Sequence, residues 1–519
     1  MSKFNSNLLN NKFLTLLVFL NFAIIYISTF TPGYGYFIDE FYYIACANNP
    51  AFGYVDHPPL APIILTIIQF LFGSSIYVIR IVPALASSVT IFFTALIVKE
   101  FGGNKYAQLL AAIGILTSPI YAATGGFYSM NAFEPLIAAV SFYLIILMIK
   151  ENNPRRWLSI GILFGLGLMN KHTAGIYIFL IVVGLFITEQ RKLLFNRWFL
   201  FSILISFTIF LPNIIWQIQN NFPTIEFYRN ITFNKNVPVS PVQFVLFQIM
   251  YYSPILFPVW LSGAIYFLFG KKLKQYRVFG IMFLIAFVFF MITKSSRPDR
   301  LAFAYPVIVA SGSFFIMNVF NKYKIRWTYG LLFSLFIIWF LICVPLVLPY
   351  LSYEKTEKLV KLLGLNTEME KGKNPRIPQL LADRIGWEEK ADMVVKVFQS
   401  ISDEDKKDVI IAGTNYGNSG AIELYGKKYN LPPVVSGHNN YYIWSKEKVN
   451  RFNDKIIVLQ LGYKDSYEGL KKSFNFVDST SAFFDNEFCS PHERNMTIYI
   501  CKEPKFPPIE ILERGKFFY

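Results

Sequence analysis

The chain has 519 residues, of which 54% are hydrophobic, 18% aromatic and only 16% charged. This composition excludes a mostly water-soluble protein. In a soluble chain, the formal net charge of +16, from 49 basic and 33 acidic residues, would indicate a polyanionic partner, so the location of that charge decides its meaning.

The basic excess lies in the first 350 residues. Residues 351–519 contain 25 Lys or Arg and 24 Asp or Glu, which leaves 24 basic and 9 acidic residues for residues 1–350. That first part carries apolar runs about as long as a helix that crosses a bilayer core. They predict eleven membrane spans, at 13–30, 76–98, 107–123, 131–149, 157–169, 174–188, 198–217, 243–269, 277–293, 301–319 and 326–349. A shorter run at 59–72 indicates a re-entrant or interfacial helix.

The charges of the loops predict how these spans are oriented. With the N-terminus in the cytosol, the inner side holds 17 basic and 3 acidic residues, against 7 basic and 6 acidic on the outer side. This bias is the positive-inside pattern of a cytoplasmic (inner) membrane protein. The first span lacks a small-residue cleavage pattern before Phe30, which indicates a retained signal anchor. An odd number of crossings then places residues 351–519 outside the cytoplasm.

The first outer loop, residues 31–60, is the most polar segment next to a span. It holds the adjacent carboxylates Asp39 and Glu40, and further on Asp56 and His57. Neighbouring carboxylates on a helix point in different directions, so one can face a site while the other anchors the loop. Asp39 is either the N-cap of a short helix or a general base or cation ligand.

One further acidic residue and one further basic residue lie at the outer ends of spans. Ionisable groups near apolar spans cost free energy, so they mark candidate sites. Glu134 opens the fourth span, and with Asn131 it has the spacing of a helix capping box. Lys171 lies in a very short outer connection, where its ammonium group could simply extend to the membrane interface.

The outer segment 294–300 is unusual because it is basic, whereas the orientation bias places most basic residues in the inner loops. Lys294 and Arg297 in this segment indicate a phosphate-bearing ligand. The alternative is an exposed turn in which Asp299 pairs with Arg297 or Arg300.

Residues 351–519 have the pattern of an α/β domain. A helix is predicted around 388–399, and strands are predicted at 408–413, 455–462 and 496–501. The stretch GTNYGNSG does not match G-x-G-x-x-G, so no dinucleotide site is predicted. Cys489 and Cys501 either form a disulfide, which an extracytoplasmic location permits, or are buried thiols.

Several motifs together resemble the integral-membrane glycosyltransferases of the GT-C superfamily, and most closely the protein O-mannosyltransferase and aminoarabinose–lipid A transferase group (glycosyltransferase family 39/83-like). These motifs are FIDEFYYIACANNPAFGYVDHPPLAP in the first outer loop, FEPL at the head of the fourth span, GLGLMNKHTAG, and IGWEE and TNYGNSGAIELYGKKYNLPPVVSGHNNYYIW after residue 351. The resemblance covers most of the chain. It implies an α-helical polytopic membrane domain of GT-C type over residues 1–350 and an extracytoplasmic (periplasmic) α/β domain over 351–519.

The resemblance also implies an activity and roles for individual residues. Members transfer a sugar from a polyprenyl-phosphate carrier to an acceptor at the outer face of the membrane, usually with inversion. Asp39 matches the catalytic base, and Glu40 matches the adjacent acid that orients the loop or the acceptor. Glu134 stands where many relatives carry a helper Asp. The expected contacts to the donor phosphate are His57, Lys171, Lys294 and Arg297.

The acceptor stays open between a glycolipid such as lipid A, a polysaccharide and a protein. No metal site is predicted, although the acidic residues could hold a divalent cation. A second class of function, a transporter or flippase of lipid-linked sugars, shares the polytopic form. Transporters place charges near the membrane midplane, whereas the charges here gather at the outer ends of the spans, which favours an enzyme.

Overall fold

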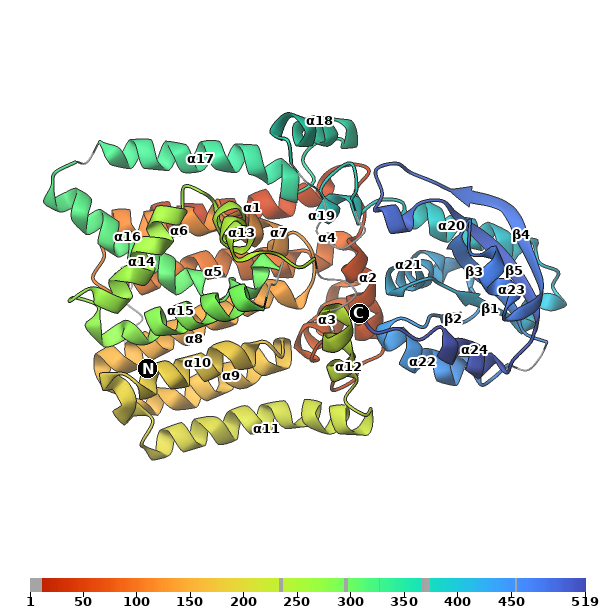
Figure 1. Cartoon of the computed structure of the whole chain (residues 1–519), viewed down its shortest axis with the longest axis horizontal. Coiled ribbons are helices and arrows are strands. Elements are labelled where there is room, and N and C mark those ends of the chain that lie inside the picture. Colours follow the sequence, from red (N-terminus) through yellow and green to blue (C-terminus); the bar gives the residue numbers. More distant parts are fainter. Residues whose placement is uncertain are drawn as a thin grey trace.

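The structure is a computed structural model that describes residues 12–232, 237–293, 297–325, 327–365, 367, 374–452 and 455–519. A bundle of helices occupies one end of the molecule, and a sheet flanked by helices occupies the other (Figure 1). The bundle is formed by residues before position 350 and the sheet by residues after it, so the change in composition along the chain coincides with a change in architecture.

The helices of the bundle follow the apolar runs of the sequence. They are α1 (Lys12–Ile27), α2 (Ile38–Asn48), α3 (Leu60–Phe72), α4 (Ile76–Ile79), α5 (Ile81–Glu100), α6 (Lys105–Leu116), α7 (Pro119–Gly125), α8 (Met130–Glu151), α9 (Trp157–Asn170), α10 (Ala174–Phe186), α11 (Arg197–Gln219), α12 (Pro223–Asn230), α13 (Pro241–Tyr252), α14 (Phe257–Phe269), α15 (Arg277–Ile292), α16 (Tyr305–Lys322) and α17 (Thr328–Val347).

The predicted count of eleven spans is not confirmed. Within the described residues, six helices are long and apolar enough to cross a membrane, or up to eight if each of two bent helix pairs counts as one span. The bent pairs are α6 with α7, at 63°, and α13 with α14, at 110°. Two predicted spans form α9 and α10, which have only 14 and 13 residues. The second bend begins at Ser253, which has a φ of +84° and is followed by Pro254, a residue that lacks a backbone N–H.

Glycines allow two helices of the bundle to touch through their backbones. A Cβ atom on Gly312 of α16 would lie 1.8 Å from the carbonyl oxygen of Val259 in α14. A Cβ atom on Gly263 would lie 2.1 Å from the carbonyl oxygen of Ile308. Such close approach is typical of membrane helices, in which small residues permit tight van der Waals packing without a hydrophobic driving force between helices.

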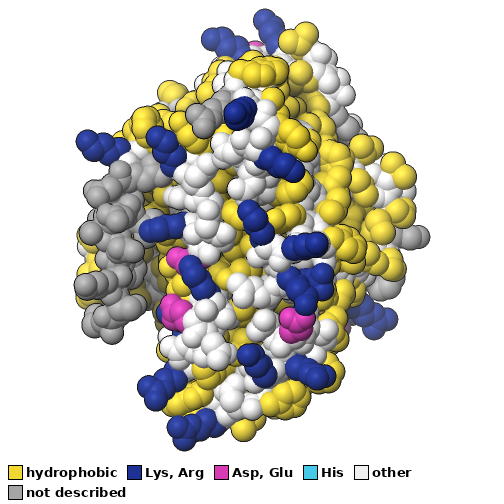
Figure 2. All heavy atoms as spheres, turned by 90° about the vertical axis from the view of Figure 1, so that its left-hand side faces the viewer, with side chains coloured by type: hydrophobic (Ala, Val, Ile, Leu, Met, Phe, Trp, Pro, Cys, Tyr) yellow, Lys and Arg dark blue, Asp and Glu magenta, His cyan; other side chains and the backbone are white. Residues whose placement is uncertain are grey.

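The basic loops that the sequence assigns to the cytosolic side lie at one end of the bundle, as far as they are described; they are residues 99–105, 150–156, 191–197, 271–277 and 322–325. Contacts link these loops to one another: Lys150 with Glu100 at 2.9 Å, Arg155 over the Trp198 ring at 5.6 Å, Tyr106 with Tyr329 at 5.0 Å between ring centroids, and Lys274 with Glu189. Figure 2 shows this end face with many Lys and Arg side chains and few carboxylates. It is the end opposite the sheet in Figure 1, as the positive-inside prediction requires.

The second part of the chain contains a five-stranded sheet with the order β2-β1-β3-β5-β4. The first three strands in this order are parallel, and β5 and β4 are antiparallel to their neighbours. The strands are β1 (Val409–Ala412), β2 (Val434–Val435), β3 (Ile457–Tyr463), β4 (Phe474–Phe484) and β5 (Met496–Pro504). The helices are α18 (Tyr353–Leu363), α19 (Gln379–Ala382), α20 (Trp387–Ser400), α21 (Tyr416–Gly426), α22 (Asn439–Val449), α23 (Tyr467–Lys471) and α24 (Pro508–Arg514).

The strand pattern explains how the two faces of the sheet are covered. Val409 and Ile411 of β1 pack with α20 and α21, whereas Ile410 between them packs on the opposite face with α22 and α24. The predicted helix around 388–399 is α20, and the three predicted strands are β1, β3 and β5.

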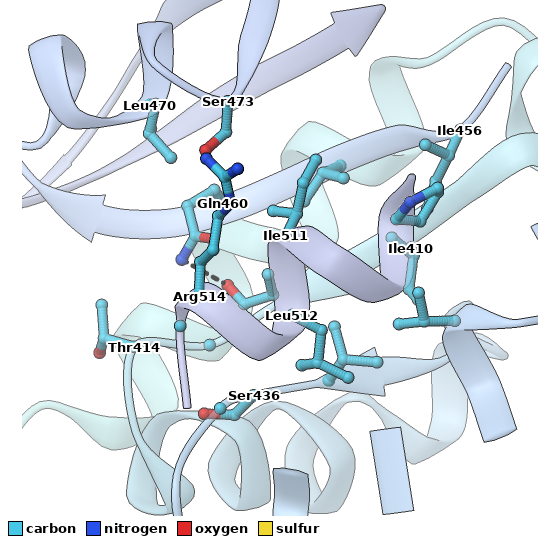
Figure 3. Close-up of a pocket in the computed structure, with 18 of the residues that line it drawn as sticks. Ile410, Thr414, Ser436, Ile456, Gln460, Leu470, Ser473, Ile511, Leu512 and Arg514 are labelled. Carbon is cyan, nitrogen blue, oxygen red and sulfur yellow. Dashed lines mark hydrogen bonds between the residues drawn. The ribbon is translucent and has the colours of Figure 1, made fainter. Parts of the chain in front are cut away.

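A cavity of about 360 Å³ lies between the sheet and α24 (Figure 3). Ile410, Ile511 and Leu512 line it, together with the polar side chains of Thr414, Ser436 and Arg514. Its described lining residues include no carboxylate and no histidine, so it offers no acid–base pair.

The four cysteines of the chain are buried free thiols. Of the two alternatives for Cys489 and Cys501, the structure therefore contains the buried thiols and not the disulfide. Burial raises the pKa of both thiols to about 12. The thiol of Cys489 also donates a hydrogen bond to the carbonyl oxygen of Ile385 at 3.2 Å.

We predict that the two ends of the molecule lie on opposite sides of the membrane. A cysteine placed at Asp403, which is 96% exposed in the sheet part, should react with a membrane-impermeant maleimide in intact spheroplasts. A cysteine at the exposed Arg191 of the basic end should react only after permeabilisation. The unmodified chain is the control, because its own cysteines are buried. The reverse labelling pattern would contradict the orientation.

Candidate functional site

Glu40 is the most completely bonded carboxylate of the first outer loop. It has no exposed surface, and Arg80 donates to both of its oxygens, from Nε at 2.9 Å and from Nη2 at 2.6 Å. Backbone N–H groups of Phe37 and Tyr128 donate to the same carboxylate at 2.7 and 2.9 Å. Glu40 thus closes the first turn of α2 and joins it to the start of α5 and to the segment before α8.

Asp39 does not cap the helix, so the N-cap alternative for this residue is wrong. The N-cap position of α2 is Phe37, and the carboxylate that serves it is Glu40. Asp39 lies within the first turn, where its Oδ1 accepts a hydrogen bond of 2.8 Å from the hydroxyl of Tyr416. Tyr416 begins α21 in the sheet part, so the two parts of the chain meet at this carboxylate.

Asp56 and His57, further along the first outer loop, contact two aromatic side chains of α2. The ring of His57 stacks on that of Tyr43 at 4.7 Å, and Tyr42 donates to Asp56 at 2.7 Å. Nδ1 of His57 lies 2.9 Å from the carbonyl oxygen of Pro58, which can only accept, so Nδ1 carries a proton. Nε2 is buried, has no hydrogen-bond partner among the described residues, and lies 3.9 Å from Asp56.

A second group of charges is built around Lys171. Its ammonium nitrogen lies 2.9 Å from Oε2 of Glu134, 2.9 Å from Oδ1 of Asn131 and 3.9 Å from Asp299. Thr173 donates to the other oxygen of Glu134 at 3.1 Å. Lys171 is buried and points to carboxylates, so its alternative role of extending to the membrane interface is wrong.

The capping-box alternative for Glu134 is also wrong. The N-cap of α8 is Ser129, whose hydroxyl accepts from the N–H of Asn131 at 3.3 Å. Glu134 is instead the buried counter-charge of Lys171, with 4% of its surface exposed.

The turn Pro298–Leu301 brings Asp299 and two arginines to this group. Burial alone would raise the pKa of Asp299, but the charges of Lys171, Arg297 and Arg300 outweigh it and hold that pKa below its usual value. Asp299 therefore does not form one isolated ion pair in an exposed turn, which was the alternative for this segment. Together with Lys171 and Glu134, the described charges of the turn are three cations and two carboxylates, which leaves one positive charge in excess. Lys294 lies outside the described residues.

The two groups of charges are joined through Tyr43. Burial and the nearby carboxylates of Asp56 and Asp39 raise the pKa of Tyr43, so its hydroxyl is neutral. That hydroxyl accepts from the N–H of Met130, at the start of α8, at 3.1 Å. The next residue along α8 is Asn131, which binds Lys171. The acidic first loop and the cationic group thus form one continuous polar site, at the end of the bundle that faces the sheet.

The residues of this site that were not among the predicted site residues include Arg80, His172 and Tyr416. Arg80 had a usable signal, because it is a lone arginine at the outer end of a span. His172 accompanies Lys171 in the motif; it lies 3.2 Å from Asn213 of α11, and burial lowers its pKa to about 4. Tyr416 had no local signal, because it is 377 residues from Asp39 along the chain.

No group of three or more His, Cys, Asp or Glu that could hold a metal ion is found in the part of the chain that the structure describes. The carboxylates of the site have protein donors instead: Arg80 for Glu40, Lys171 for Glu134 and Tyr416 for Asp39.

Comparisons with known proteins agree with this architecture. The family model described as "Dolichyl-phosphate-mannose-protein mannosyltransferase" matches residues 56–216. A curated relative, undecaprenyl phosphate-alpha-4-amino-4-deoxy-L-arabinose arabinosyl transferase 1 of Pseudomonas fluorescens (strain Pf0-1), is 20% identical over 189 residues. This match covers 36% of the chain and only 33% of the relative's length.

Two solved structures resemble the whole fold. ArnT from Cupriavidus metallidurans bound to undecaprenyl phosphate has a TM-score of 0.59 and 12% identity, over 96% of this chain and 98% of that one. The Archaeoglobus fulgidus oligosaccharyltransferase in complex with Zn and sulfate has a TM-score of 0.53 and 15% identity, over 86% of this chain and 67% of that one. The resemblance to the GT-C glycosyltransferases is thus confirmed by the family model and the curated relative, which match part of the chain, and the solved structures show that the fold extends through both parts of the chain.

We predict that removing the charge of Glu40 destabilises the protein strongly. Glu40→Gln would leave the guanidinium of Arg80 buried without a counter-charge, which typically costs about 3–5 kcal/mol. The matched control is Glu151→Gln, which breaks the exposed pair with Arg156 and should cost less than about 1 kcal/mol. Thermal unfolding in detergent measures both variants. Equal melting temperatures for the two would contradict the anchoring role of Glu40.

Proposed function

We propose that this GT-C-fold protein is a glycosyltransferase of the cytoplasmic (inner) membrane. It would move a sugar from a polyprenyl-phosphate-linked donor to a glycolipid, polysaccharide or protein acceptor at the outer face. The observation that carries this proposal is the continuous polar site, in which an acidic loop and a cationic group meet where the bundle joins the sheet part. The sheet part would then lie outside the cytoplasm and cover the site.

In the proposed reaction, Asp39 is the general base. A hydroxyl of the acceptor loses its proton to the carboxylate of Asp39 while its oxygen attacks the anomeric carbon of the donor sugar. The bond between that carbon and the phosphate oxygen breaks, and polyprenyl phosphate leaves with the electron pair. Attack from the face opposite the phosphate inverts the anomeric configuration. If the acceptor were itself a phosphate, as on lipid A, Asp39 would orient the acceptor without removing a proton.

The cationic group is suited to the donor phosphate. Lys171, Arg297 and Arg300 surround Asp299 and leave positive charge in excess, which would stabilise the negative charge that develops on the leaving phosphate. Glu134 would hold Lys171 in position through their 2.9 Å ion pair. Lys294 is proposed to belong to the same group on sequence grounds alone.

His57 is suited to contact a sugar hydroxyl more than the donor phosphate. With a proton on Nδ1 and none on Nε2, the ring would present a lone pair on Nε2, which would accept a hydrogen bond from a sugar hydroxyl. Contact with the donor phosphate would require a proton on Nε2 as well. Glu40 would act on the reaction only through the backbone of α2.

One observation favours the alternative, a transporter or flippase of lipid-linked sugars. The two bent helix pairs touch at their breaks, where the hydroxyl of Ser118 donates to the carbonyl oxygen of Tyr252 at 3.0 Å. Interrupted spans in two halves of a protein are a mark of transporters. However, the described α7, α13 and α14 contain no charged residue, so these breaks lack the ion-binding groups that such transporters place there.

We predict that Asp39→Asn abolishes transfer without affecting membrane insertion, because the amide cannot accept the proton. The assay supplies purified protein with lipid-linked sugars extracted from a strain lacking the gene, and with the envelope fraction of that strain as acceptor. The measured quantity is release of polyprenyl phosphate. The matched control is Asp478→Asn, at an exposed position on β4, which should retain full activity.

Two outcomes of that assay would contradict the proposal in different ways. Full turnover by folded Asp39→Asn would remove Asp39 as the base. Movement of the lipid-linked sugar between the leaflets of reconstituted vesicles, without any release of polyprenyl phosphate, would establish the transporter instead.

We also predict that Arg297→Gln weakens donor binding. Losing one charge-assisted hydrogen bond should raise the apparent KM for the lipid-linked donor by about tenfold or more and leave the apparent KM for the acceptor unchanged. Arg229→Gln is the control, because Arg229 is an exposed arginine on α12, outside the cationic group. An equal effect of both substitutions would mean that only general surface charge matters.

A further inference from the structure

A stack of four aromatic rings runs from the first outer loop to the end of the chain. Tyr42 of α2 stacks on Tyr416 of α21 at 4.8 Å between ring centroids, with 28° between the ring planes. Tyr416 stacks on His438 at 4.5 Å and 28°, and His438 stacks on Phe517 at 4.2 Å and 23°. Figure 1 places the C-terminal end of the chain beside α2, as these contacts require.

Hydrogen bonds determine how the middle rings are oriented. The N–H of Tyr416 donates to Nδ1 of His438 at 3.3 Å, so this nitrogen carries no proton. Nε2 then carries the proton and donates to the main-chain oxygen of Tyr519 at 2.8 Å. His438 is therefore tied at both ring nitrogens, and Tyr416 is held between two rings while its hydroxyl donates to Asp39 at 2.8 Å.

The backbone that carries Asp39 is held separately. Its neighbour Glu40 is anchored to Arg80, and Gly420 of α21 lies so close to α2 that a Cβ atom there would be 3.0 Å from the carbonyl oxygen of Phe41. The N–H groups of Gly35 and Ile38 also donate to carbonyl oxygens of the sheet part, at 2.9 and 3.1 Å. The position of Tyr416 relative to Asp39 is thus set by contacts on both sides.

We propose that Tyr416, supplied by the sheet part of the chain, is a positioning residue for the carboxylate of Asp39. This inference rests on the proposed function, in which Asp39 is the base. The hydroxyl would hold the carboxylate plane toward the acceptor and stabilise its charged form, because a hydrogen bond to a carboxylate favours ionisation. The sheet part is then a component of the active site and not only its cover.

Other ionisable groups face Asp39 and must be considered in any pH dependence. Tyr43 on the same helix interacts electrostatically with both Asp39 and Asp56, and Tyr42 bonds Asp56 directly. On the side of the sheet part, the described ionisable groups that contact this place include Tyr416 itself and His438 behind it. The substitution Tyr416→Phe in the test below leaves all of these other groups in place.

The test compares Tyr416→Phe with Tyr441→Phe in the polyprenyl phosphate release assay described above. Tyr416→Phe keeps the stacked ring but removes the hydroxyl, and should lower kcat about 10- to 100-fold, the effect typical of losing a hydrogen bond to a charged group. Tyr441 is a matched control, because it is a buried tyrosine of the same interface whose hydroxyl donates to Glu423 at 2.6 Å. Its substitution should leave kcat unchanged.

The pH profile separates positioning from a structural effect. Without the Tyr416 hydroxyl, the pKa of the Asp39 carboxyl should rise, so the acid limb of kcat/KM should move to higher pH. Tyr441→Phe should not move it. His438→Leu, which removes the supporting ring and keeps the hydroxyl, should move the limb in the same direction with a smaller loss of kcat.

The outcomes distinguish this inference from the proposed function. If Asp39→Asn is inactive while Tyr416→Phe and His438→Leu keep the kcat and pH profile of the unmodified protein, the positioning role is wrong and the proposed function stands. If Tyr416→Phe loses activity only in proportion to a loss of folded protein, with its acid limb unmoved, Tyr416 is structural. If the unmodified protein releases no polyprenyl phosphate, the proposed function itself fails.

Discussion

The buried carboxylate of Glu40 is the constraint on which the site depends. An ionised group without exposed surface is tolerated only when its bonds replace those of water, and here Arg80 and two backbone N–H groups do so. These bonds connect α2, α5 and the segment before α8. Glu40 holds the backbone of α2 through these bonds, and its neighbour Asp39 faces the sheet part. The pair of adjacent acids thus divides into an anchor and a candidate base.

The distribution of charge differs between the two ends of the bundle. The basic loops lie together at one end of the bundle (Figure 2), and the mixed acidic and basic site lies at the end that contacts the sheet part through Asp39 and Tyr416. This distribution agrees with the prediction that most of the net charge of +16 reflects orientation in a membrane. The charge that bears on the proposed reaction is the small excess around Lys171, Arg297 and Arg300, where carboxylates hold the cations in place.

Much of the fold was predictable because its signals are local. Apolar runs, strand patterns and the bias of the loop charges depend on neighbouring residues, and they identified the helical bundle, three strands and the basic end. The span count was not confirmed, because α9 and α10 are short and because two runs bend sharply, at Ser253 in one case. The strand β2, with two residues, and β4, with several exposed residues on an edge, gave too weak a pattern.

The sequence predicted which residues belong to the candidate site better than it predicted how these residues contact one another. The loop motifs and the resemblance located Asp39, Glu40, Glu134 and Lys171, but the capping roles considered for Asp39 and Glu134 belong to Glu40 and Ser129. Tyr416 could not be predicted, because its contact with Asp39 depends on how two distant parts of the chain pack against each other.

The most direct test of the account is an experimental structure of the protein with polyprenyl phosphate bound. The account predicts that the phosphate lies within hydrogen-bond distance of Lys171, Arg297 or Arg300, on the side of the bundle that faces Asp39. A phosphate bound instead among the lysines and arginines of the opposite, basic end would contradict it.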